Sequence, residues 1–390
     1  MARVLYIWQG RYPWEVRVEK FCLALQAAGH EVAVLARWKA GQAREEDIQA
    51  TRVMRVGHGL PGPATLPVPF NPVWAAAIRR AITDWRPDIV LAREIMLAEP
   101  AATVCRKRGI PLVMDMAEHY PATMRTFEKY RRGIPKLLVC DARLPDRVER
   151  RAVARANGII TVCEEQNDRL HALYGYPRER MAVVHNTPDL GMFAAVRRGS
   201  SCPPRVFGYH GHMTAQRGLD RLIRGFALIA PHHPEARLDL AGDGESRPAL
   251  MQLVQECGLA DRARFTGRYR FEDLVTLYSE TDVGLVVYPV DESTEHTLGN
   301  KVFDYFACGK PVIASPTIPL RRLIAETRAG LVLEGDTPEA IAAGLAAAAS
   351  SEPTAWSENG LAVAHTKYNW ACDQQVLLTF LASLLHNKHS

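Results

Sequence analysis

The sequence predicts an α/β protein made of two doubly wound domains, each a parallel sheet covered by helices on both faces. Short apolar, β-branched runs alternate with segments of helical period along the whole chain, which is typical of this class. The runs are apolar nearly throughout, as in strands buried on both faces. The alternation restarts after a stretch rich in Pro, Gly and Ser near the middle of the 390 residues. The length suffices for two cores of ordinary size with a cleft between the domains.

The first domain is expected over residues 1–190. One helix shows the basis of the assignments: Val18, Phe21, Cys22 and Leu25 share a face, and Gly29 ends the pattern. The expected strands are 4–8, 31–36, 88–92, 111–115, 158–163 and 182–186. The expected helices lie near 16–28, 73–84, 97–108, 143–156 and 165–173.

A second domain is expected over residues 205–367. Residues 191–204 lose periodicity and gain Pro, Gly and Ser, so they are the predicted linker. The expected strands are 205–211, 237–242, 263–267, 283–289, 311–315 and 329–333. The expected helices lie at 219–230, 246–257, 300–308 and 338–349.

The composition indicates the cellular compartment of the protein. The eight cysteines have no C-x-x-C spacing and lie in or beside apolar segments, as buried free thiols do. No apolar stretch approaches the roughly 20 residues that span a bilayer. The first ten residues resemble a strand more than a secretory signal. We therefore expect a cytoplasmic protein, with peripheral contact at the inner face of a membrane as an extension of that prediction.

The charge is unevenly distributed. The net charge of +5 divides into +10 for residues 1–200 (31 basic, 21 acidic) and −5 for residues 201–390 (17 basic, 22 acidic). The basic excess peaks over residues 125–155, where Lys and Arg interleave with Phe, Ile and Leu. This segment fits either a solvated helix face with packed side-chain stems or a surface for anionic lipid. No nucleic-acid recognition motif occurs, so we expect no nucleic-acid partner.

Several chemistries lack their sequence signatures. No G-x-G-x-x-G follows the first strand, and no G-x-x-x-x-G-K-[ST] occurs, which argues against nicotinamide binding and a P-loop. The 13 histidines form no H-E-x-x-H motif and no cluster with cysteine, so no metal site is predicted. The acidic run AGDGE (241–245) is interpreted as a turn after a strand.

Four runs in the second half carry a resemblance: GYHGHMTAQRGLDRLI, LDLAGDGE, ARFTGRY and TLGNKVFDYFACGKPVIAS. In order and spacing they resemble the C-terminal half of the family-4 retaining glycosyltransferases. GHEVAVLA, RPDIVLAR, DMAEHYP, ANGIITVCEE and AVVHNTPD resemble the first half of that family less specifically. The resemblance implies the GT-B fold, two Rossmann-like domains facing a cleft. It also implies that residues 368–385 form a helix that crosses back onto the first domain and couples closure of the two.

The resemblance implies that the second domain binds a nucleotide-sugar donor. Gly211 and His212 match a phosphate-facing loop, although many members have Arg where His212 stands. Arg217 occupies the position of a phosphate-binding Lys, and a guanidinium can bind phosphate bidentately. The family holds the nucleotide base by backbone contacts near Arg268 and Tyr269, which leaves the base undetermined, with UDP or GDP favoured.

A helix start supplies further donor contacts. Transfer from a diphosphate needs stabilisation of the departing charge, which free amides at a helix start and cations provide. The helix that opens at Leu298, Gly299 and Asn300 meets this need, because glycine permits close approach of the backbone. Lys301 adds a cation if it points inward; the alternative is an exposed lysine that opposes the helix dipole.

The sugar-facing residues depart from the family pattern. Asp304 stands where the family places a Glu on the ribose hydroxyls, and its alternative role is an internal cap or salt bridge. Eight positions earlier the family has a second Glu near the transferred sugar, and this chain has His296. Glu295 or Glu292 from the same loop is an alternative reader of the sugar hydroxyls.

The first domain is expected to bind the acceptor. Glu118 and His119, just after the strand 111–115, are the catalytic candidates together with Arg217; Glu118 is also an acceptor-binding candidate. They would orient the acceptor hydroxyl or stabilise an oxocarbenium-like transition state. Ala117 replaces the usual His of the family. Arg93 is a further acceptor candidate at a neighbouring strand end, with Glu94 beside it.

The loop after the first strand contains the remaining candidate site residues of the first domain. Gly10 permits close approach to donor phosphate or acceptor, or is an ordinary turn glycine. Arg11, Tyr12 and Trp14 follow it, with Arg11 and Trp14 as acceptor contacts.

The sequence thus predicts a retaining, metal-independent glycosyltransferase that moves a sugar from a nucleotide sugar to a hydroxyl acceptor. The acceptor is a lipid-linked glycan, a polysaccharide precursor or a small molecule. One alternative is an epimerase or phosphorylase on the same fold. Another is a non-catalytic membrane-associated subunit, because the usual His at 117 and Glu at 296 are missing.

Overall fold

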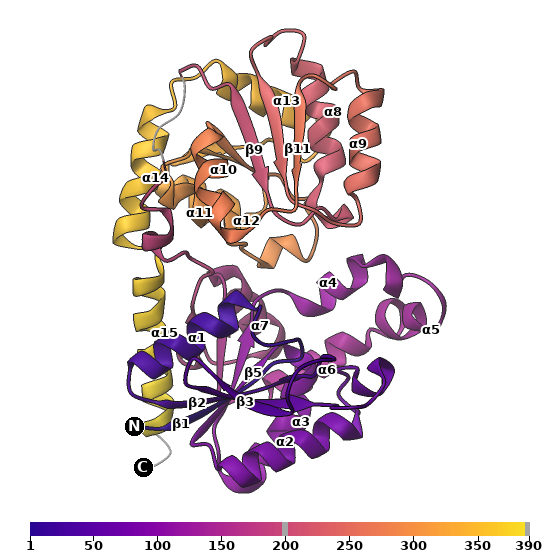
Figure 1. The fold of residues 1–390 in the computed structure, drawn as a ribbon, viewed down its shortest axis with the longest axis vertical. Helices are drawn as coiled ribbons and strands as arrows, with labels where there is room; N and C mark the ends of the chain where they lie inside the picture. Colours follow the sequence, from indigo (N-terminus) through magenta and orange to yellow (C-terminus); the bar gives the residue numbers. More distant parts are fainter. Residues whose placement is uncertain (197–201, 387–390) are drawn as a thin grey trace. The chain divides into compact units, whose positions relative to one another are not determined.

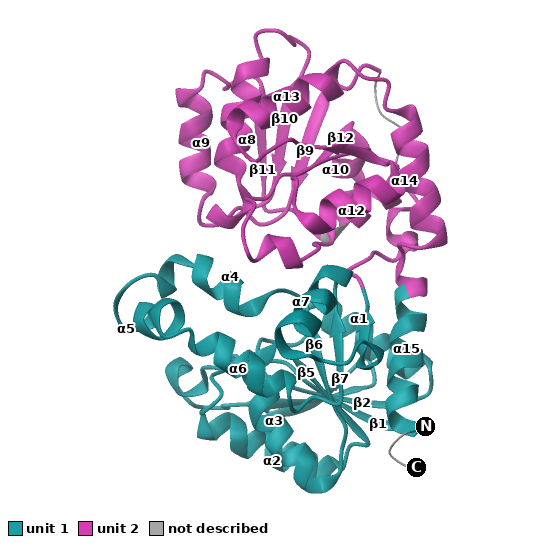
Figure 2. Ribbon diagram, turned by 180° about the vertical axis from the view of Figure 1, so that it is seen from behind, with its two compact units in different colours: residues 1–184, 373–390 teal, residues 185–372 magenta. Residues whose placement is uncertain are grey.

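The protein, a computed structural model that describes residues 1–196 and 202–386, divides into two compact units. The first comprises Met1–Val184 and the chain from Asp373 onward, and the second comprises His185–Cys372 (Figure 2). The expected linker 191–204 belongs to the second unit, and its residues 197–201 lie outside the described residues.

The described part of the first unit holds an eight-stranded sheet in the order β3-β4-β2-β1-β5-β6-β7-β8 (Figure 1). All neighbours pair in parallel except β3, which runs antiparallel to β4 at the edge. The strands are β1 (Arg3–Ile7), β2 (Glu31–Arg37), β3 (Glu45–Ile48), β4 (Thr51–Val56), β5 (Ile89–Arg93), β6 (Leu112–Met116), β7 (Gly158–Thr161) and β8 (Met181–Val183).

Helices α2, α3 and α6 pack on this sheet and bury a shared core with Trp74, Ile78 and Leu97. Between α4 and α6 the chain makes short 3-10, α and π turns rather than one long helix. The helices assigned to this unit are α1 (Val16–Ala27), α2 (Pro72–Trp85), α3 (Ile95–Arg108), α4 (Tyr120–Thr126), α5 (Gly133–Lys136), α6 (Leu144–Val153), α7 (Glu164–Tyr174) and, from residue 373, α15 (Trp370–His386).

The described part of the second unit holds a six-stranded, fully parallel sheet in the order β11-β10-β9-β12-β13-β14. The strands are β9 (Val206–His210), β10 (Arg237–Ala241), β11 (Ala263–Gly267), β12 (Val283–Val286), β13 (Val312–Ala314) and β14 (Gly330–Val332). The helices are α8 (Leu219–Ile229), α9 (Arg247–Glu256), α10 (Leu274–Glu280), α11 (Lys301–Ala307), α12 (Ile318–Thr327), α13 (Pro338–Ala349) and α14 (Thr354–Thr366).

Both sheets are doubly wound, and this fixes where a ligand can bind. In the first sheet the strand order reverses at β1, which lies between β2 and β5; in the second it reverses at β9, between β10 and β12. Loops leaving the carboxyl ends of two such strands diverge to opposite faces and leave a crevice between them. The candidate ligand-binding loops are therefore those after β1, β5 and β6 in the first unit and, taken separately, those after β9, β10 and β12 in the second.

The expected α/β alternation is confirmed, but one hairpin was not expected. Strands β3 and β4 are joined at Gln49 and Ala50, whose φ angles are 47° and 61°. A turn with two left-handed residues normally carries Asn or Gly, and Gln49 and Ala50 therefore carry no turn signal. Helices α10, α12 and α14 were likewise not expected.

Helix α15 packs on the first unit through a glycine. A Cβ atom at Gly158, the first residue of β7, would lie 2.8 Å from both Phe380 Cζ and Leu384 Cδ1. The absence of a side chain at Gly158 lets the last turns of α15 lie against the sheet.

We expect Gly158→Val to lower the free energy of unfolding of the first unit by about 1–3 kcal/mol, because the added methyl groups overpack this contact. Urea unfolding followed by circular dichroism measures the effect. Gly335→Ala is the control, because its added Cβ would meet only Ala340 Cβ at 3.5 Å. Equal midpoints for the two variants would contradict the packing described.

Candidate functional site

In the second unit, the loops after β9 and β10 cross at glycines. Gly242 (φ 139°) lies so close to Gly211 that a Cβ at 242 would overlap the Gly211 carbonyl oxygen. Gly244 (φ 156°) is similarly pressed against the carbonyl oxygen of Met213. The amide of Met213 also donates to the Asp243 carbonyl at 2.9 Å. The AGDGE run is thus a turn after a strand, as expected.

A pocket of about 440 Å³ opens beside this crossing. It includes four of the predicted donor-binding residues, so the structure brings these together. The lining residues are Gly211, His212, Gly242, Asp243, Gly244, Arg268 and Tyr269.

Two cations lie next to this pocket, around the ring of Tyr288. Lys301, the first residue of α11, is only 9% exposed and lies across Gly211, where an added Cβ would come within 2.5 Å of Lys301 Cε. Its ammonium donates to the Tyr288 hydroxyl. The guanidinium carbon of Arg217 lies 5.3 Å from the centre of the Tyr288 ring. Lys301 therefore points inward, which resolves the alternative left open by the sequence.

The electrostatics of this cluster favour an anion. Burial lowers the pKa of Lys301, and the charge of Arg217 lowers it further. Burial by itself would raise the pKa of Tyr288, but Lys301 and Arg217 outweigh burial and the net pKa is lowered. Lys301 and Arg217 repel each other, which raises the free energy of both charged side chains. A negative ligand between them stabilises both charges. A phosphate group fits this requirement.

Asp304 lies one helical turn into α11 and is half-buried. Its Oδ2 accepts hydrogen bonds from Asn300 Nδ2 at 3.3 Å and from the Tyr278 hydroxyl at 3.4 Å. Burial raises the pKa of Tyr269 and the charge of Asp304 raises it further, so Asp304 lies near Tyr269, which lines the pocket.

The loop before α11 uses its acidic residues differently. The Glu295 carboxylate accepts from the Ile318 amide at 2.7 Å and so holds the start of α12. His296 is half-buried in a 3-10 turn, and Glu292 is exposed. Leu298 is buried in the core, so only its backbone can serve a ligand, and Gly299 lies over the Tyr288 hydroxyl.

In the first unit a buried carboxylate organises the ligand-facing edge. Asp115 in β6 is fully buried and accepts from Arg17 Nη2 at 2.8 Å, from Arg93 Nη1 at 3.3 Å and from the Tyr6 hydroxyl. Burial by itself would raise the pKa of Asp115, but Arg17 and Arg93 outweigh it and lower the pKa below 3.8. Arg17 also donates to the Val184 carbonyl at 2.9 Å.

The predicted acceptor residue Arg93 belongs to this cluster. Besides Asp115, it pairs with Glu15 Oε1 at 2.9 Å, and its guanidinium carbon lies 5.1 Å from the Trp8 ring centre. Its side chain is buried, and contact with the acceptor stays a prediction.

The loop after β1 presents two predicted contacts to solvent. Arg11 is exposed, and Trp14 is 67% exposed with a left-handed backbone (φ 101°). Tyr12 is buried instead. Gly10 is closed in by the Trp8 ring, 2.6 Å from where a Cβ would stand, which makes a side chain at this turn impossible without movement.

The catalytic candidates of this unit follow β6. Glu118 is half-buried, and its carbonyl accepts from Gln166 Nε2 at 3.3 Å. His119 is buried and occupies the residue before α4. Both stand at the carboxyl edge of the sheet, as expected; their catalytic roles stay predictions.

Two residues were missed. Tyr288 was counted as the interior of a strand, although β12 ends at Val286 and places it in the following loop. Arg17 was missed because it lies on an otherwise apolar helix face. A buried arginine needs a partner, so its place beside Val18 and Phe21 was the available signal.

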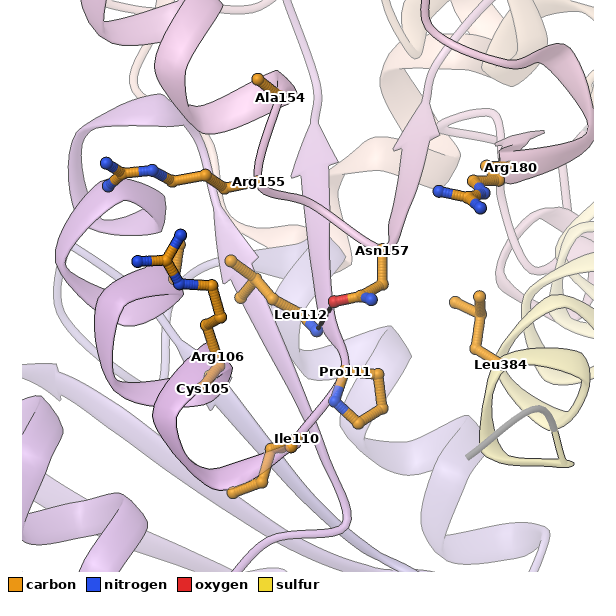
Figure 3. A pocket seen from close by; sticks show the side chains of 12 residues that line it. Cys105, Arg106, Ile110, Pro111, Leu112, Ala154, Arg155, Asn157, Arg180 and Leu384 are labelled. Carbon is orange, nitrogen blue, oxygen red and sulfur yellow. Dashed lines mark hydrogen bonds between the residues drawn. The ribbon is translucent and has the colours of Figure 1, made fainter. Parts of the chain in front are cut away.

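Another pocket, of about 490 Å³, opens at the opposite edge of the first sheet, where β6 and β7 begin (Figure 3). There Asn157 Oδ1 accepts from the Leu112 amide at 3.0 Å, and Arg155 pairs with Glu99 at 2.7 Å. Because ligands of such sheets bind at the carboxyl edge, this pocket is not part of the candidate site. Within residues 1–196 and 202–386, no cluster of three potential metal ligands occurs.

Comparison with known sequences identifies both halves. A family model described as Glycosyltransferase Family 4 matches residues 15–191, and one described as Glycosyl transferases group 1 matches residues 204–351. A glycogen synthase of Mycobacterium tuberculosis is 24% identical over 317 residues, which span 76% of this chain and 73% of that protein. A D-inositol 3-phosphate glycosyltransferase of Mycolicibacterium gilvum is 27% identical over 239 residues, 59% of this chain and 53% of that protein.

Solved structures share the fold. Sucrose-phosphate synthase from Thermosynechococcus elongatus matches with a TM-score of 0.79 at 19% identity, covering 99% of this chain and all of that one. Anabaena HepE in complex with UDP and glucose matches with a TM-score of 0.73 at 16% identity, covering 98% of this chain and 100% of that one. WaaG, a glycosyltransferase involved in lipopolysaccharide biosynthesis, matches with a TM-score of 0.70 at 16% identity, covering 97% and 99%.

The fold and the matches to both halves define an enzyme that transfers a sugar from a nucleotide sugar. Each half of the chain thus matches a glycosyltransferase family model, and the GT-B fold is confirmed, as the sequence motifs indicated.

The Asp115 cluster gives a prediction about stability. Asp115→Asn should lower the free energy of unfolding by about 3–5 kcal/mol near neutral pH, because it leaves Arg17 and Arg93 without their buried carboxylate. The lowered pKa of Asp115 stabilises the fold above the unfolded value of 3.8, and this stabilisation is lost as the pH falls through the native value.

Urea unfolding at several pH values tests both parts. The difference between wild type and Asp115→Asn should shrink below about pH 4. Asp84→Asn is the control, because its pair with Arg80 is exposed and such pairs contribute about 0–1 kcal/mol. A difference that is independent of pH would contradict the role assigned to the ionised carboxylate.

Proposed function

We propose that the protein is a retaining glycosyltransferase in which the second unit binds the nucleotide-sugar donor and the first unit binds a hydroxyl acceptor. The observation that carries the proposal is the pair of cations, the buried Lys301 and the half-buried Arg217, around Tyr288 at the carboxyl edge of the second sheet. A diphosphate bound there would be neutralised by both cations, and the missing side chains of Gly211 and Gly299 leave the room that Lys301 and the Tyr288 hydroxyl occupy.

The reaction follows from this placement. The bond between the anomeric carbon and the donor phosphate oxygen breaks, and a bond to the acceptor oxygen forms on the same face of the sugar. The acceptor proton passes to the departing phosphate oxygen, whose charge Lys301 and Arg217 stabilise. Glu118 and His119 would orient the acceptor hydroxyl or stabilise positive charge on the sugar. The step requires no metal ion.

UDP is our proposed donor nucleotide, with GDP as the alternative. HepE, which shares the fold, was solved with UDP and with UDP-glucose. Tyr269 and Arg268 line the pocket that would take the nucleotide, and Asp304 offers a carboxylate to the ribose hydroxyls. The relatives act on glycogen, inositol phosphate or lipopolysaccharide by name, which supports a role in glycan, glycolipid or glycosylated-metabolite synthesis.

Nucleotide binding tests the donor site by thermal shift, because a ligand that binds the folded state raises its apparent stability. UDP or GDP should raise the midpoint of wild type equally with and without Mg²⁺. Lys301→Met, Arg217→Gln and Asp304→Ala should each weaken this binding roughly tenfold or more, since each loses a charged contact. Each variant is compared with its own ligand-free midpoint.

Arg224→Gln serves as the control, because Arg224 is an exposed arginine on the same unit. Full nucleotide shifts in all three site variants would overturn the donor site. Conversion of a nucleotide sugar without transfer of its sugar to an acceptor would favour the epimerase alternative. Activity that depends on inorganic phosphate would favour the phosphorylase alternative.

We also propose that the basic segment 125–155 contacts an anionic membrane surface on the cytoplasmic side. Ile134 is 73% exposed and Leu137 and Leu138 are exposed beside it, on the short α5 and the π-helical turn Leu137–Asp141. Arg132 and Lys136 flank them with exposed side chains. This part of the first unit loops out from α4 and α6 (Figure 1).

Apolar side chains between exposed cations are the arrangement that inserts into the headgroup region of anionic lipid. Across the described ranges, no helix is long and apolar enough to cross a bilayer, so the proposed attachment is peripheral.

Cosedimentation with vesicles tests this contact. The variant Ile134→Ser/Leu137→Ser/Leu138→Ser should bind vesicles of phosphatidylglycerol and phosphatidylcholine at least about tenfold more weakly than wild type. The control Leu60→Ser/Leu66→Ser/Phe70→Ser removes three exposed apolar side chains elsewhere on the same unit. Equal loss in both variants, or no binding by wild type, would contradict a membrane role for the segment.

A further inference from the structure

Glu94 has a backbone conformation that a glutamate adopts at a cost. It follows β5 and precedes α3 with φ 64° and ψ 170°, a region almost restricted to glycine. Its side chain is 3% exposed. A glycine would fit this position without strain, so the side chain itself needs an explanation, and such strain concentrates at functional sites.

Within the described residues, only one of the two carboxyl oxygens of Glu94 accepts a hydrogen bond. Oε1 accepts from the Ala117 amide at 3.4 Å, which directs the group toward the loop after β6. Oε2 is buried and, in the part of the chain that the structure describes, has no hydrogen-bond partner. A buried acceptor without a partner is rare and destabilising.

Gln9 presents a second such oxygen beside it. Strand β1 pairs with β5 up to Ile7 opposite Ala92, and Gln9 and Glu94 each follow two residues later, beyond the carboxyl ends of these neighbouring strands. Gln9 Nε2 donates to the Tyr120 hydroxyl at 3.4 Å, while Gln9 Oε1 is buried and makes no hydrogen bond within the described residues. Two unsatisfied oxygens thus stand at the ends of neighbouring parallel strands.

Their chemistry selects the ligand. Both are oxygens that accept hydrogen bonds, so the ligand must supply hydrogen-bond donors. An ionised carboxylate or phosphate has no donor to offer the Gln9 oxygen, and an apolar group would leave both oxygens unpaired. Hydroxyl groups fit, because each can donate to one oxygen and accept from a neighbour.

We propose that Glu94 and Gln9 bind the acceptor through neighbouring hydroxyl groups, and that the acceptor group is a polyhydroxylated ring, a sugar or a cyclitol. The proposal rests on the proposed function, since it places the acceptor in the first unit. It narrows the acceptor from any hydroxyl compound to a ring polyol and assigns the strain at Glu94 to ligand binding.

The protonation state agrees with this role. Burial raises the pKa of Glu94 well above its ordinary value; Glu118 and Asp115 raise it further, and Arg93 opposes them. Burial also raises the pKa of Tyr120, and the charge of Glu94 raises it further, so Tyr120 is a titratable neighbour of Glu94. A protonated Glu94 donates as well as accepts, so it can bind a hydroxyl in either sense.

Binding of two probes to the full chain tests the proposal: myo-inositol and methyl α-D-glucopyranoside, measured by saturation-transfer NMR. Wild type should bind at least one of them. Glu94→Gly should weaken that binding about tenfold or more, yet its thermal midpoint should equal or exceed that of wild type, because glycine relieves the strained backbone. If Glu94 had only a structural role, its replacement would not weaken probe binding while the thermal midpoint stayed the same or rose.

Arg86→Gly is the matched control. Arg86 also has a left-handed backbone (φ 51°) but is exposed at the end of α2, so its variant should gain stability and keep full probe binding. Gln9→Leu removes the second oxygen and should weaken probe binding in the same way, which keeps the test valid if Glu94→Gly does not fold.

Three outcomes are decisive. Equal probe binding by wild type, Glu94→Gly and Gln9→Leu would overturn the proposal, and so would the lack of any binding by wild type. If wild type binds a probe but shows no thermal shift with UDP or GDP, the proposed donor site is contradicted and the acceptor proposal is not, because probe binding to the first unit is measured without nucleotide.

Discussion

The buried carboxylate of Asp115 ties together the elements that shape the carboxyl edge of the first sheet. Through Arg17 it holds α1, through Arg93 it holds β5, and through Tyr6 it holds β1. A charge in this position is stable only with partners on several sides. The loops after β1, β5 and β6 therefore start from fixed points, and the strained Glu94 is one residue beyond Arg93.

In the second unit the charged groups that lie together are two cations, not a carboxylate with its cationic partners. This unit buries Lys301 beside Arg217 and provides a tyrosine, not a carboxylate, as the group between them. The half-buried Asp304 is bound instead by Asn300 and Tyr278. In the first unit Asp115 is paired with two arginines, whereas in the second a lysine and an arginine lie against one tyrosine. This contrast supports the proposal that a phosphate-bearing donor binds the second unit and an uncharged polyol binds the first.

The site residues could be predicted where a short stretch of sequence sets their geometry. Glycines at 211, 242 and 299 and a cation at the start of a helix are recognisable from neighbours in the sequence. Tyr288 was not, because an aromatic residue after an apolar run looks like a continued strand. The hairpin β3–β4 was missed for a similar reason: its turn is formed by Gln49 and Ala50, which carry no turn signal. The engagement of Glu295 with α12 depends on residues 23 positions away.

The sequence by itself determined the α/β class, the restart of the pattern in a second sheet and the family, because strand and helix periodicity and glycine-rich loops are local properties of the chain. Only the tertiary structure decided which charged groups are satisfied. Arg93 and Glu94 are adjacent in the sequence, yet Arg93 is paired with Asp115 and Glu15, while one oxygen of Glu94 has no hydrogen-bond partner among the residues that the structure describes. That difference arises from residues that parallel pairing brings together from distant parts of the chain, and no local pattern encodes it.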